Sequence, residues 1–397
     1  MAVLRTPALE ATAAIRYRNM ALVVGLSGNV VAPEFTGGRL DGIGTYTLAL
    51  ESELRALGVD VRRVLAPKWS GSRFIVPGDA SLRFAMPQPI SIAINLMAGA
   101  RGVGARDVER AVDIYHATDY MAPPLARRPV VATLFDAISL RNPEWASPHW
   151  RSLKNMLMRG ASQTADRVIA ISHAAAVEVI EHFGVRPERV RVVPLGVDSS
   201  LFSPRAPAAV SSTLGRLGLR HGYFLFVGTL QPRKNVIGLL QAYASLPESI
   251  RRTRQLVIAG KVGWRAEELR EQLLRGRADN RCVWLDYVAP GDLPPLYAGA
   301  RALVLPSLAE GFGLPILEAL AVGVPVIASD LPALRESGGR VTTYVPAGDP
   351  AALSEAMRAM HELVETSGAA HERREHARGF SWRACAERTL AVYRELA

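Results

Sequence analysis

Short apolar runs typical of buried strands alternate with helical patterns along almost the whole chain, in two successive series. A run such as "YFLFVG" (223–228) is apolar throughout and ends at a glycine, which favours a parallel strand covered by helices on both faces. The alternation therefore predicts an α/β fold with two parallel sheets. The expected strands are 21–26, 59–66, 112–118, 129–135, 167–172 and 190–196 in the first series and 223–228, 254–260, 282–288, 302–307, 324–330 and 341–346 in the second.

The length of 397 residues also favours two domains, because single cores rarely grow beyond about 250–300 residues. Segment 198–212 is rich in Pro, Ser and Ala, and we interpret it as the linker. The predicted organisation is an N-terminal extension at 1–19, a first domain at 20–200, a second domain at 213–377 and a last helix at 378–397 that packs toward the first domain.

Composition excludes several classes of protein. Apolar residues make up 49% of the chain and charged residues 21%, which indicates a globular protein. The two cysteines, Cys282 and Cys385, are too few and too far apart for a disulfide framework or a cysteine metal site, so we expect a reducing cytoplasmic compartment. The longest uncharged run, 84–100, contains two prolines and is too short in its apolar part to span a membrane, and no secretory signal is apparent. The net charge of +10 suits phosphorylated ligands or anionic lipid as well as nucleic acid.

Ligands of open α/β sheets bind beyond the carboxyl ends of the strands, so each strand exit is a candidate site. The first exit is a long loop that is rich in glycine and enters a helix near Ile43. Backbone amides at this helix start would face a phosphate, although the loop matches neither the dinucleotide fingerprint nor a P-loop. A mobile surface loop is the alternative. The glycines concerned are Gly37, Gly38, Gly42 and Gly44.

The second exit, "FVGTLQPRKNVIGLL", leaves a strand at Gly228 and enters a helix near Asn235. Arg233 and Lys234 directly precede that helix. Two cations and a helix N-terminus together can hold a diphosphate. The alternative is a solvated turn.

The third exit, "EGFGLPILEALAVG", places two glutamates eight residues apart. Gly311 and Gly313 end the preceding strand, and Pro315 suits the first turn of a helix that ends near Gly323. Glu310 is then in the loop and Glu318 about one turn into the helix, so they would hold two parts of one hydroxyl-rich ligand. A carboxylate such as Glu318 can accept both hydroxyls of a ribose. The alternative is a loop glutamate and a helix-start glutamate favoured by the helix dipole.

These motifs resemble those of the retaining GT-B glycosyltransferases of family four, over about residues 21–395. The most specific is the E-x7-E motif, "EGFGLPILE"; "FVGTLQPRKN" resembles the phosphate-binding element of the family and "GIGTYT" its N-terminal glycine turn. "YHATDYMAPP", "FDAISLRNPEW" and "VVPLGVD" resemble a mannosyltransferase-like branch of surface-polysaccharide biosynthesis that often uses GDP-mannose.

The resemblance implies two Rossmann-like domains facing across a cleft, with the C-terminal helix crossing back to the first. It places the donor on the second domain and the acceptor on the first. It implies Glu318 on the donor ribose, Glu310 with the amides of Phe312 and Gly313 on the donor sugar, and Arg233 and Lys234 on the diphosphate. The remaining donor contacts that it implies are Gly42, Gly44, Thr229, Val288, Gly311 and Leu314.

Two positions depart from the family pattern. Much of the family has an arginine at the position of Thr229, so Arg233 is expected to supply that charge. The branch usually reads His-Asp where this chain reads Phe135-Asp136, and that histidine normally contacts the transferred sugar. Asp136 is therefore a catalytic candidate, with Glu310, Arg233 and Lys234. His116, Phe135 and His173 are candidates for the acceptor side, and a structural role is the alternative for each histidine.

The predicted function is transfer of a hexose, with mannose from GDP-mannose favoured, to a glycan or lipid-linked acceptor in bacterial polysaccharide, lipopolysaccharide or glycolipid biosynthesis. We expect retention of configuration, no cofactor and no essential metal, because the chain has no Asp-x-Asp motif and no closely spaced histidines. The alternatives are a nucleotide-sugar epimerase or hydrolase of the same fold and a nucleotide-sugar-binding pseudoenzyme, which Phe135 favours.

Segment 149–165 is basic and contains no acidic residue. Trp150, Leu153 and Leu157 share one helical face, which would suit peripheral contact with anionic lipid on the inner face of the cytoplasmic membrane. An ordinary amphipathic surface helix is the alternative. We expect no nucleic-acid partner.

Overall fold

The computed structural model describes residues 22–397 except residue 39 and segments 71–72, 79–81, 146–150, 264–266 and 276–280. The predicted N-terminal extension at 1–19 lies outside the described residues. By their packing, the residues form two compact units, 1–133 with 160–167 and 386–397, and 134–159 with 168–385. The domain limits drawn from the sequence stay a prediction.

The first sheet has seven strands in the order β5–β2–β1–β6–β7–β8–β9, and every pair with a described register is parallel. All six strands expected in the first series are present. The sequence missed the short strand β5 and a separate antiparallel hairpin of β3 and β4, because segments of two or three residues carry no periodicity. The strands are β1 Val23–Ser27, β2 Asp60–Leu65, β3 Lys68–Ser70, β4 Arg73–Ile75, β5 Leu82–Arg83, β6 Ile114–Ala117, β7 Val130–Leu134, β8 Arg167–Ala170 and β9 Val190–Val192.

The second sheet has six parallel strands in the order β12–β11–β10–β13–β14–β15, and all six were expected. Its central strands are almost fully buried, as their continuous apolar sequences predict. The order reverses between β10 and β13, which are neighbours although β11 and β12 separate them in sequence. Such a reversal opens a crevice for a ligand at the carboxyl ends of the strands. The strands are β10 Tyr223–Val227, β11 Leu256–Ala259, β12 Cys282–Leu285, β13 Ala300–Leu305, β14 Val326–Ser329 and β15 Thr343–Val345.

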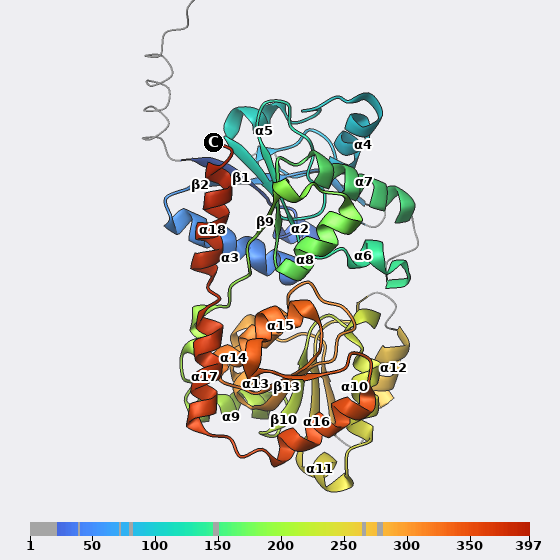
Figure 1. Ribbon diagram of the computed structural model, residues 1–397, viewed down its shortest axis with the longest axis vertical. Coiled ribbons are helices and arrows are strands. Elements are labelled where there is room, and N and C mark those ends of the chain that lie inside the picture. Colours follow the sequence, from blue (N-terminus) through green and yellow to red (C-terminus); the bar gives the residue numbers. More distant parts are fainter. Residues whose placement is uncertain are drawn as a thin grey trace, which may run out of the picture. The chain divides into compact units, whose positions relative to one another are not determined.

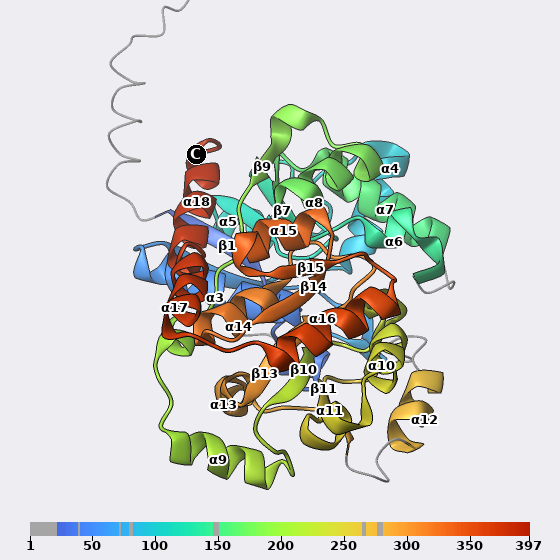
Figure 2. The ribbon, with the colours of Figure 1, turned by 60° about the horizontal axis from the view of Figure 1, so that its bottom comes forward.

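Helices cover the second sheet in two groups, one with α10 beside α16 and one with α14 beside α13 and α17 (Figure 1, and Figure 2 from a second direction). None of the described helices is long and apolar enough to cross a membrane. The helices are α2 Pro33–Thr36, α3 Gly42–Ala56, α4 Gln88–Ala98, α5 Arg106–Ala111, α6 Ile138–Arg141, α7 Arg151–Thr164, α8 His173–Glu178, α9 Pro207–Arg216, α10 Val236–Ala244, α11 Glu248–Thr253, α12 Glu267–Arg275, α13 Leu293–Ala298, α14 Leu314–Val322, α15 Pro332–Gly338, α16 Pro350–Glu362, α17 Ser367–Arg378 and α18 Trp382–Arg394.

The end of the last helix, α18, packs into the first unit. Tyr393 is fully buried, and its hydroxyl lies 2.7 Å from Nδ1 of His116 on β6. The chain therefore returns to its first unit at its end, as the resemblance implied.

Segment 198–212, which we interpreted as a linker, contains the 3-10 turn Ser199–Phe202 and the beginning of α9. Pro207 is the first residue of α9, where its fixed φ angle suits a helix and its missing N–H costs nothing. Pro and Ala in this segment thus mark the start of a helix as well as a connection.

Candidate active site

Two loops meet at the carboxyl ends of the neighbouring strands β10 and β13. The loop after β10 forms the 3-10 turn Pro232–Lys234, and Asn235 in the left-handed region (φ 51°) leads into α10. The backbone N–H of Leu308 in the other loop donates to the carbonyl of Arg233 at 2.7 Å. Arg233 and Lys234 therefore precede a helix, as predicted, and their loop is fastened to the one that carries Glu310.

Glu310 is the centre of a buried charge cluster. Its Oε2 lies 2.9 Å from Nη1 of Arg233, and its Oε1 accepts from Lys234 and, at 2.7 Å, from Ser307. The carboxylate is only 6% exposed. Burial alone would raise the pKa of Glu310, but the charges of Lys234 and Arg233 and these hydrogen bonds outweigh it and lower the pKa to about 2. Glu310 is therefore ionised throughout the physiological range.

Two cations, Arg233 and Lys234, face the carboxylate of Glu310 in this cluster. Arg233 also donates to the carbonyl of Ala309 at 3.1 Å, which fixes the guanidinium against the loop. Burial lowers the pKa of Lys234, and Arg233 beside it acts in the same direction, while Glu310 and Asp136 oppose the shift. Such fixed, partly desolvated cations suit a diphosphate. The resemblance had assigned Glu310 and the two cations to different parts of the donor, and the structure brings them together.

The glycines after Glu310 are required by the backbone. Gly313 has φ 95° and precedes α14, and a Cβ there would lie 2.5 Å from the side chain of Leu334. Pro315 occupies the first turn of α14, and Gly323 ends it in the left-handed region. The helix predicted from Pro315 to Gly323 is therefore confirmed. Phe312 is buried and packs edge-on against Phe380 with ring centroids 6.0 Å apart, so its side chain supports the loop and its amide lies in the exit region.

Glu318 lies in α14 and accepts a hydrogen bond of 2.5 Å from the hydroxyl of Tyr297. Burial raises the pKa of Glu318, while the bond from Tyr297 acts in the opposite direction. Tyr297 belongs to α13, so no local pattern in the sequence pointed to this contact. Ser307 was also missed, although its position three residues before Glu310 was a local signal.

The other predicted donor contacts lie at separate strand exits. Thr229 follows β10, Val288 follows β12, and Gly311 and Leu314 flank Phe312 and Gly313. Gly42 is the first residue of α3, and the amide of Gly44 donates to its N-cap Asp41 at 2.9 Å.

The two histidine candidates for the acceptor side, His116 and His173, differ in burial. His116 is fully buried, with Nδ1 bonded to Tyr393 and Nε2 2.8 Å from the hydroxyl of Thr133. Both ring nitrogens are thus occupied, and burial lowers the pKa of His116 to about 3. These contacts favour the alternative that His116 has a structural role. His173 is exposed at the first position of α8.

The loop after β7 carries the pair that departs from the family pattern. Phe135 is buried, and Oδ1 of Asp136 accepts from the amide of Ile138 at 3.1 Å. Asp119, after the neighbouring strand β6, was missed by the sequence analysis. It accepts from the amide of Met121 at 3.0 Å, and burial raises its pKa. Asp119 is part of the motif "YHATDYMAPP", which the sequence analysis used only as a whole, for its resemblance to the family.

The amphipathic helix of the basic segment is α7. Leu157 is buried, so the prediction that it faces lipid is wrong; its position on a common helical face did not reveal that this part of α7 packs inward. Leu153 and Met156 are exposed instead. Trp150 lies outside the described residues. In the described part of the chain, no group of three or more His, Cys, Asp or Glu side chains is arranged to hold a metal ion.

Comparison with known proteins agrees with both halves of this architecture. Residues 40–201 match the family described as Glycosyltransferase Family 4, and residues 221–362 match Glycosyl transferases group 1. The chain is 32% identical over 380 residues to the O-antigen chain mannosyltransferase B of Escherichia coli, covering 90% of this chain and 97% of that protein. It is 29% identical over 266 residues to the serotype-specific mannosyltransferase WbdA of Escherichia coli, of which it covers 32%.

Solved structures agree on the fold. HepE from Anabaena, solved in complex with UDP-glucose, superposes with a TM-score of 0.71 at 20% identity and covers 95% of this chain and 100% of its own. With two parallel α/β sheets, matching family regions in both halves and a relative similar over nearly its whole length, the chain belongs to glycosyltransferase family 4, the glycosyl transferases group 1 with the GT-B fold.

Proposed function

We propose that this glycosyltransferase moves mannose from GDP-mannose to a glycan or lipid-linked acceptor in bacterial surface-polysaccharide biosynthesis, with retention of configuration and without an essential metal. The observation that carries the proposal is the buried cluster of Arg233, Lys234 and Glu310 at the point where the strand order reverses. The similarity to a mannosyltransferase of O-antigen chains supports the choice of sugar and of acceptor class.

Each part of the donor has a matching group in this arrangement. The diphosphate would lie on Arg233, Lys234 and the first amides of α10, where cations and a helix N-terminus act together. The ribose hydroxyls would donate to Glu318, which Tyr297 holds in orientation.

The transferred sugar would lie against the amides of Phe312 and Gly313. Glu310 would accept from its hydroxyls while it also holds the two cations in place. Asp136 is the proposed polar contact on the acceptor side, in the loop where the family usually has a histidine.

The donor is tested by thermal shift with GDP-mannose, GDP-glucose, UDP-glucose and ADP-glucose. A ligand that binds the native state raises the apparent stability by an amount set by its concentration and affinity. UDP-glucose is included because the structurally similar HepE was solved with it. We expect the largest shift with GDP-mannose. A shift with UDP-glucose alone would overturn the proposed donor.

The catalytic part is tested by nucleotide release with and without a mannose-terminated acceptor that carries a hydrophobic aglycone. We expect release of GDP that depends on the acceptor. Release without acceptor would favour a hydrolase or epimerase, and binding without release a pseudoenzyme, the alternative that Phe135 favours.

We also propose that the protein docks peripherally on anionic lipid through α7. Arg151, Lys154 and Arg159 lie on this helix, with Leu153 and Met156 exposed between them. Co-sedimentation with phosphatidylglycerol vesicles should occur at low salt and weaken as salt screens the charges. Charge-reversed Lys154→Glu should weaken it further, and equal sedimentation with neutral phosphatidylcholine vesicles would contradict this docking.

A further inference from the structure

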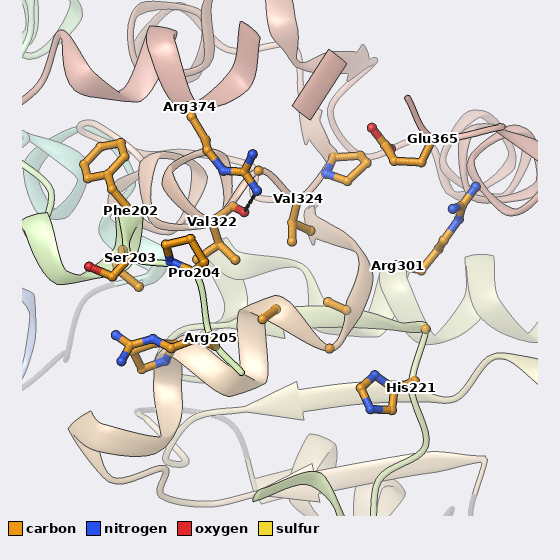
Figure 3. Close-up of a pocket in the computed structure, with 18 of the residues that line it drawn as sticks. Phe202, Ser203, Pro204, Arg205, His221, Arg301, Val322, Val324, Glu365 and Arg374 are labelled. Atoms are coloured by element: carbon orange, nitrogen blue, oxygen red, sulfur yellow. Dashed lines mark hydrogen bonds between the residues drawn. The ribbon is translucent and has the colours of Figure 1, made fainter. Parts of the chain in front are cut away.

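A cavity of about 530 Å³ lies in the second unit, at the amino ends of the strands and thus away from the charge cluster of Glu310. Four strands begin at its wall: Gly222 precedes β10, Arg254 precedes β11, Arg301 is the second residue of β13 and Pro325 precedes β14. Its volume is within the range of about 300–1,000 Å³ typical of small-molecule sites. Figure 3 shows residues from the segment before α9, from β13 and from α17 around it.

The wall of this cavity is strongly basic. Four arginines from separate segments line it, together with His221, against a single carboxylate, Glu365. Among the described residues, none of the four guanidinium groups forms an ion pair with a carboxylate, and Glu365 itself pairs with Arg373. The four arginines are Arg205, Arg254, Arg301 and Arg374.

The arginines are held in place by backbone carbonyls. Arg374 donates to the carbonyl of Val322 at 3.0 Å, a bond drawn in Figure 3. Arg301 donates to the carbonyl of Met360 at 2.7 Å, and Arg254 to that of Gly222 at 3.2 Å. Arg205 donates to the carbonyl of Ser200 at 3.0 Å. Neutral carbonyls fix the planar groups but do not neutralise their charge, and, of the residues that the structure describes, Glu365 is the one carboxylate that lines the cavity.

Like charges in this wall act on one another. Burial lowers the pKa of Arg301, and the neighbouring charge of Arg254 lowers it further, while Glu365 opposes the shift. Burial and the charges of Arg254 and Arg301 lower the pKa of His361, whose Nδ1 accepts a hydrogen bond of 3.2 Å from Nε of Arg254. An anion in the cavity would relieve this repulsion.

We propose that the cavity is a binding site for a small phosphorylated sugar, separate from the donor site. Planar guanidinium groups bind phosphate oxygens in pairs, and several of them around one cavity suit a dianion such as a phosphate monoester. Glu365 offers an acceptor for sugar hydroxyls at the wall. The cavity and the charge cluster lie at opposite ends of β13, whose six residues span roughly 20 Å.

The test is calorimetric titration of the full chain with glucose 6-phosphate as the probe. We expect one binding event that glucose does not produce and that Lys234→Ala, in the donor site, leaves unchanged. Arg374→Gln should weaken it by roughly tenfold or more, as expected when one charge-assisted contact is lost. Arg252→Gln is the matched control, because this exposed arginine of the same unit pairs with Glu248 outside the cavity.

Arg374→Gln could also affect folding, because Arg374 donates to the carbonyl of Val322 at the end of α14. Arg205 is exposed, so Arg205→Gln tests the cavity independently of folding. It should weaken binding in the same direction while thermal unfolding stays as in the wild type. Unchanged affinity in both cavity variants, or loss of binding in Lys234→Ala, would overturn the proposed site. Binding of inorganic phosphate as tight as that of glucose 6-phosphate would overturn the sugar part of the proposal.

Discussion

Nη1 of Arg233 lies 2.9 Å from Oε2 of Glu310, and this pair joins the loops after two strands that are neighbours in the sheet but distant in sequence. A donor diphosphate that binds Arg233 must therefore share it with a carboxylate already in place. Glu310 keeps the cations close together and ionised before the ligand arrives, which is the kind of preorganisation that electrostatic stabilisation requires.

Replacing Glu310 should cost stability, because it leaves the buried Lys234 and the half-buried Arg233 without their carboxylate. Glu310→Gln keeps the shape and removes the charge, and we expect unfolding in urea to show a loss of about 3 kcal/mol. Glu248→Gln is the control, since Glu248 bridges arginines at the surface and its loss should have a much smaller effect.

The same carboxylate predicts a pH dependence. The pKa of Glu310 is lowered in the folded state, so its contribution is fully present above about 4.5 and is lost as the pH falls toward about 2. Glu310→Gln should lack this part of the acid destabilisation. A variant with the wild-type acid profile and unchanged stability would show that the ion pair contributes nothing.

Lys234→Ala should weaken binding of GDP far more than binding of guanosine. The ammonium group is buried at the exit of β10, where we propose that the diphosphate binds. We assign it no contact with the guanine base. Loss of a charge-assisted contact corresponds to about 1.5–3 kcal/mol, which is roughly a tenfold to hundredfold loss of affinity. Calorimetry with both ligands measures the difference, and Lys154→Ala on α7 is the control. Equal losses for GDP and guanosine would remove Lys234 from the phosphate site.

The hydrogen bond from Tyr297 to Glu318 predicts that Tyr297 affects the pH dependence of donor affinity, although Tyr297 itself need not contact the donor. Burial raises the pKa of Glu318 and the tyrosine hydroxyl opposes this, so Tyr297→Phe should raise it further. We expect the affinity of Tyr297→Phe for GDP-mannose to fall at a higher pH than that of the wild type as the solution is acidified, whereas Glu318→Gln should bind weakly throughout.

Tyr243→Phe is the matched control for the Tyr297 variant, since its hydroxyl donates to the carbonyl of Arg254 at 2.7 Å. Its affinity should keep the wild-type pH profile. Wild-type affinity of Glu318→Gln would exclude Glu318 from the donor site.

The sequence predicted the strands and the motif helix because both depend on local pattern. Continuous apolar runs and the succession of glycine and proline around Glu310 act within ten residues, and each was found where expected. The partners of the glutamates could not be predicted, because Tyr297 and Arg233 reach them only through the order of the strands and helices. The inward packing of Leu157 and the burial of His116 likewise depend on tertiary contacts, so no local sequence pattern predicts them.

His116 predicts a second acid-sensitive step. Its pKa is lowered to about 3, so the unfolded chain binds a proton that the folded chain does not once the pH falls below about 6.5. Stability should therefore fall between pH 6.5 and 4, by up to about 1.4 kcal/mol per pH unit. Urea unfolding across this range should give a shallower slope for His116→Gln than for the wild type, while exposed His371→Gln should keep the wild-type slope. Identical slopes in all three proteins would assign the acid sensitivity to other groups.

The last prediction concerns the chemistry: we expect transfer with retention and in excess chelator. As the glycosidic bond breaks, negative charge grows on the departing diphosphate, and Arg233, Lys234 and the first amides of α10 are fixed where that charge would form. Inversion would need a side-chain base on the opposite face of the sugar. Phe135 cannot be that base, and in its loop only Asp136 is ionisable, with Oδ1 accepting from the amide of Ile138.

Attack on the same face needs no side-chain base, because the leaving phosphate can take the proton of the acceptor hydroxyl. The measurement is the anomeric proton coupling of the product by NMR, with the reaction run in excess EDTA and its rate compared with that in added Mg²⁺. We expect the anomeric configuration of the donor and a rate that the chelator does not change. Inverted product would overturn the same-face attack, and activity lost in EDTA and restored by Mg²⁺ would show that the cation cluster alone does not stabilise the leaving group.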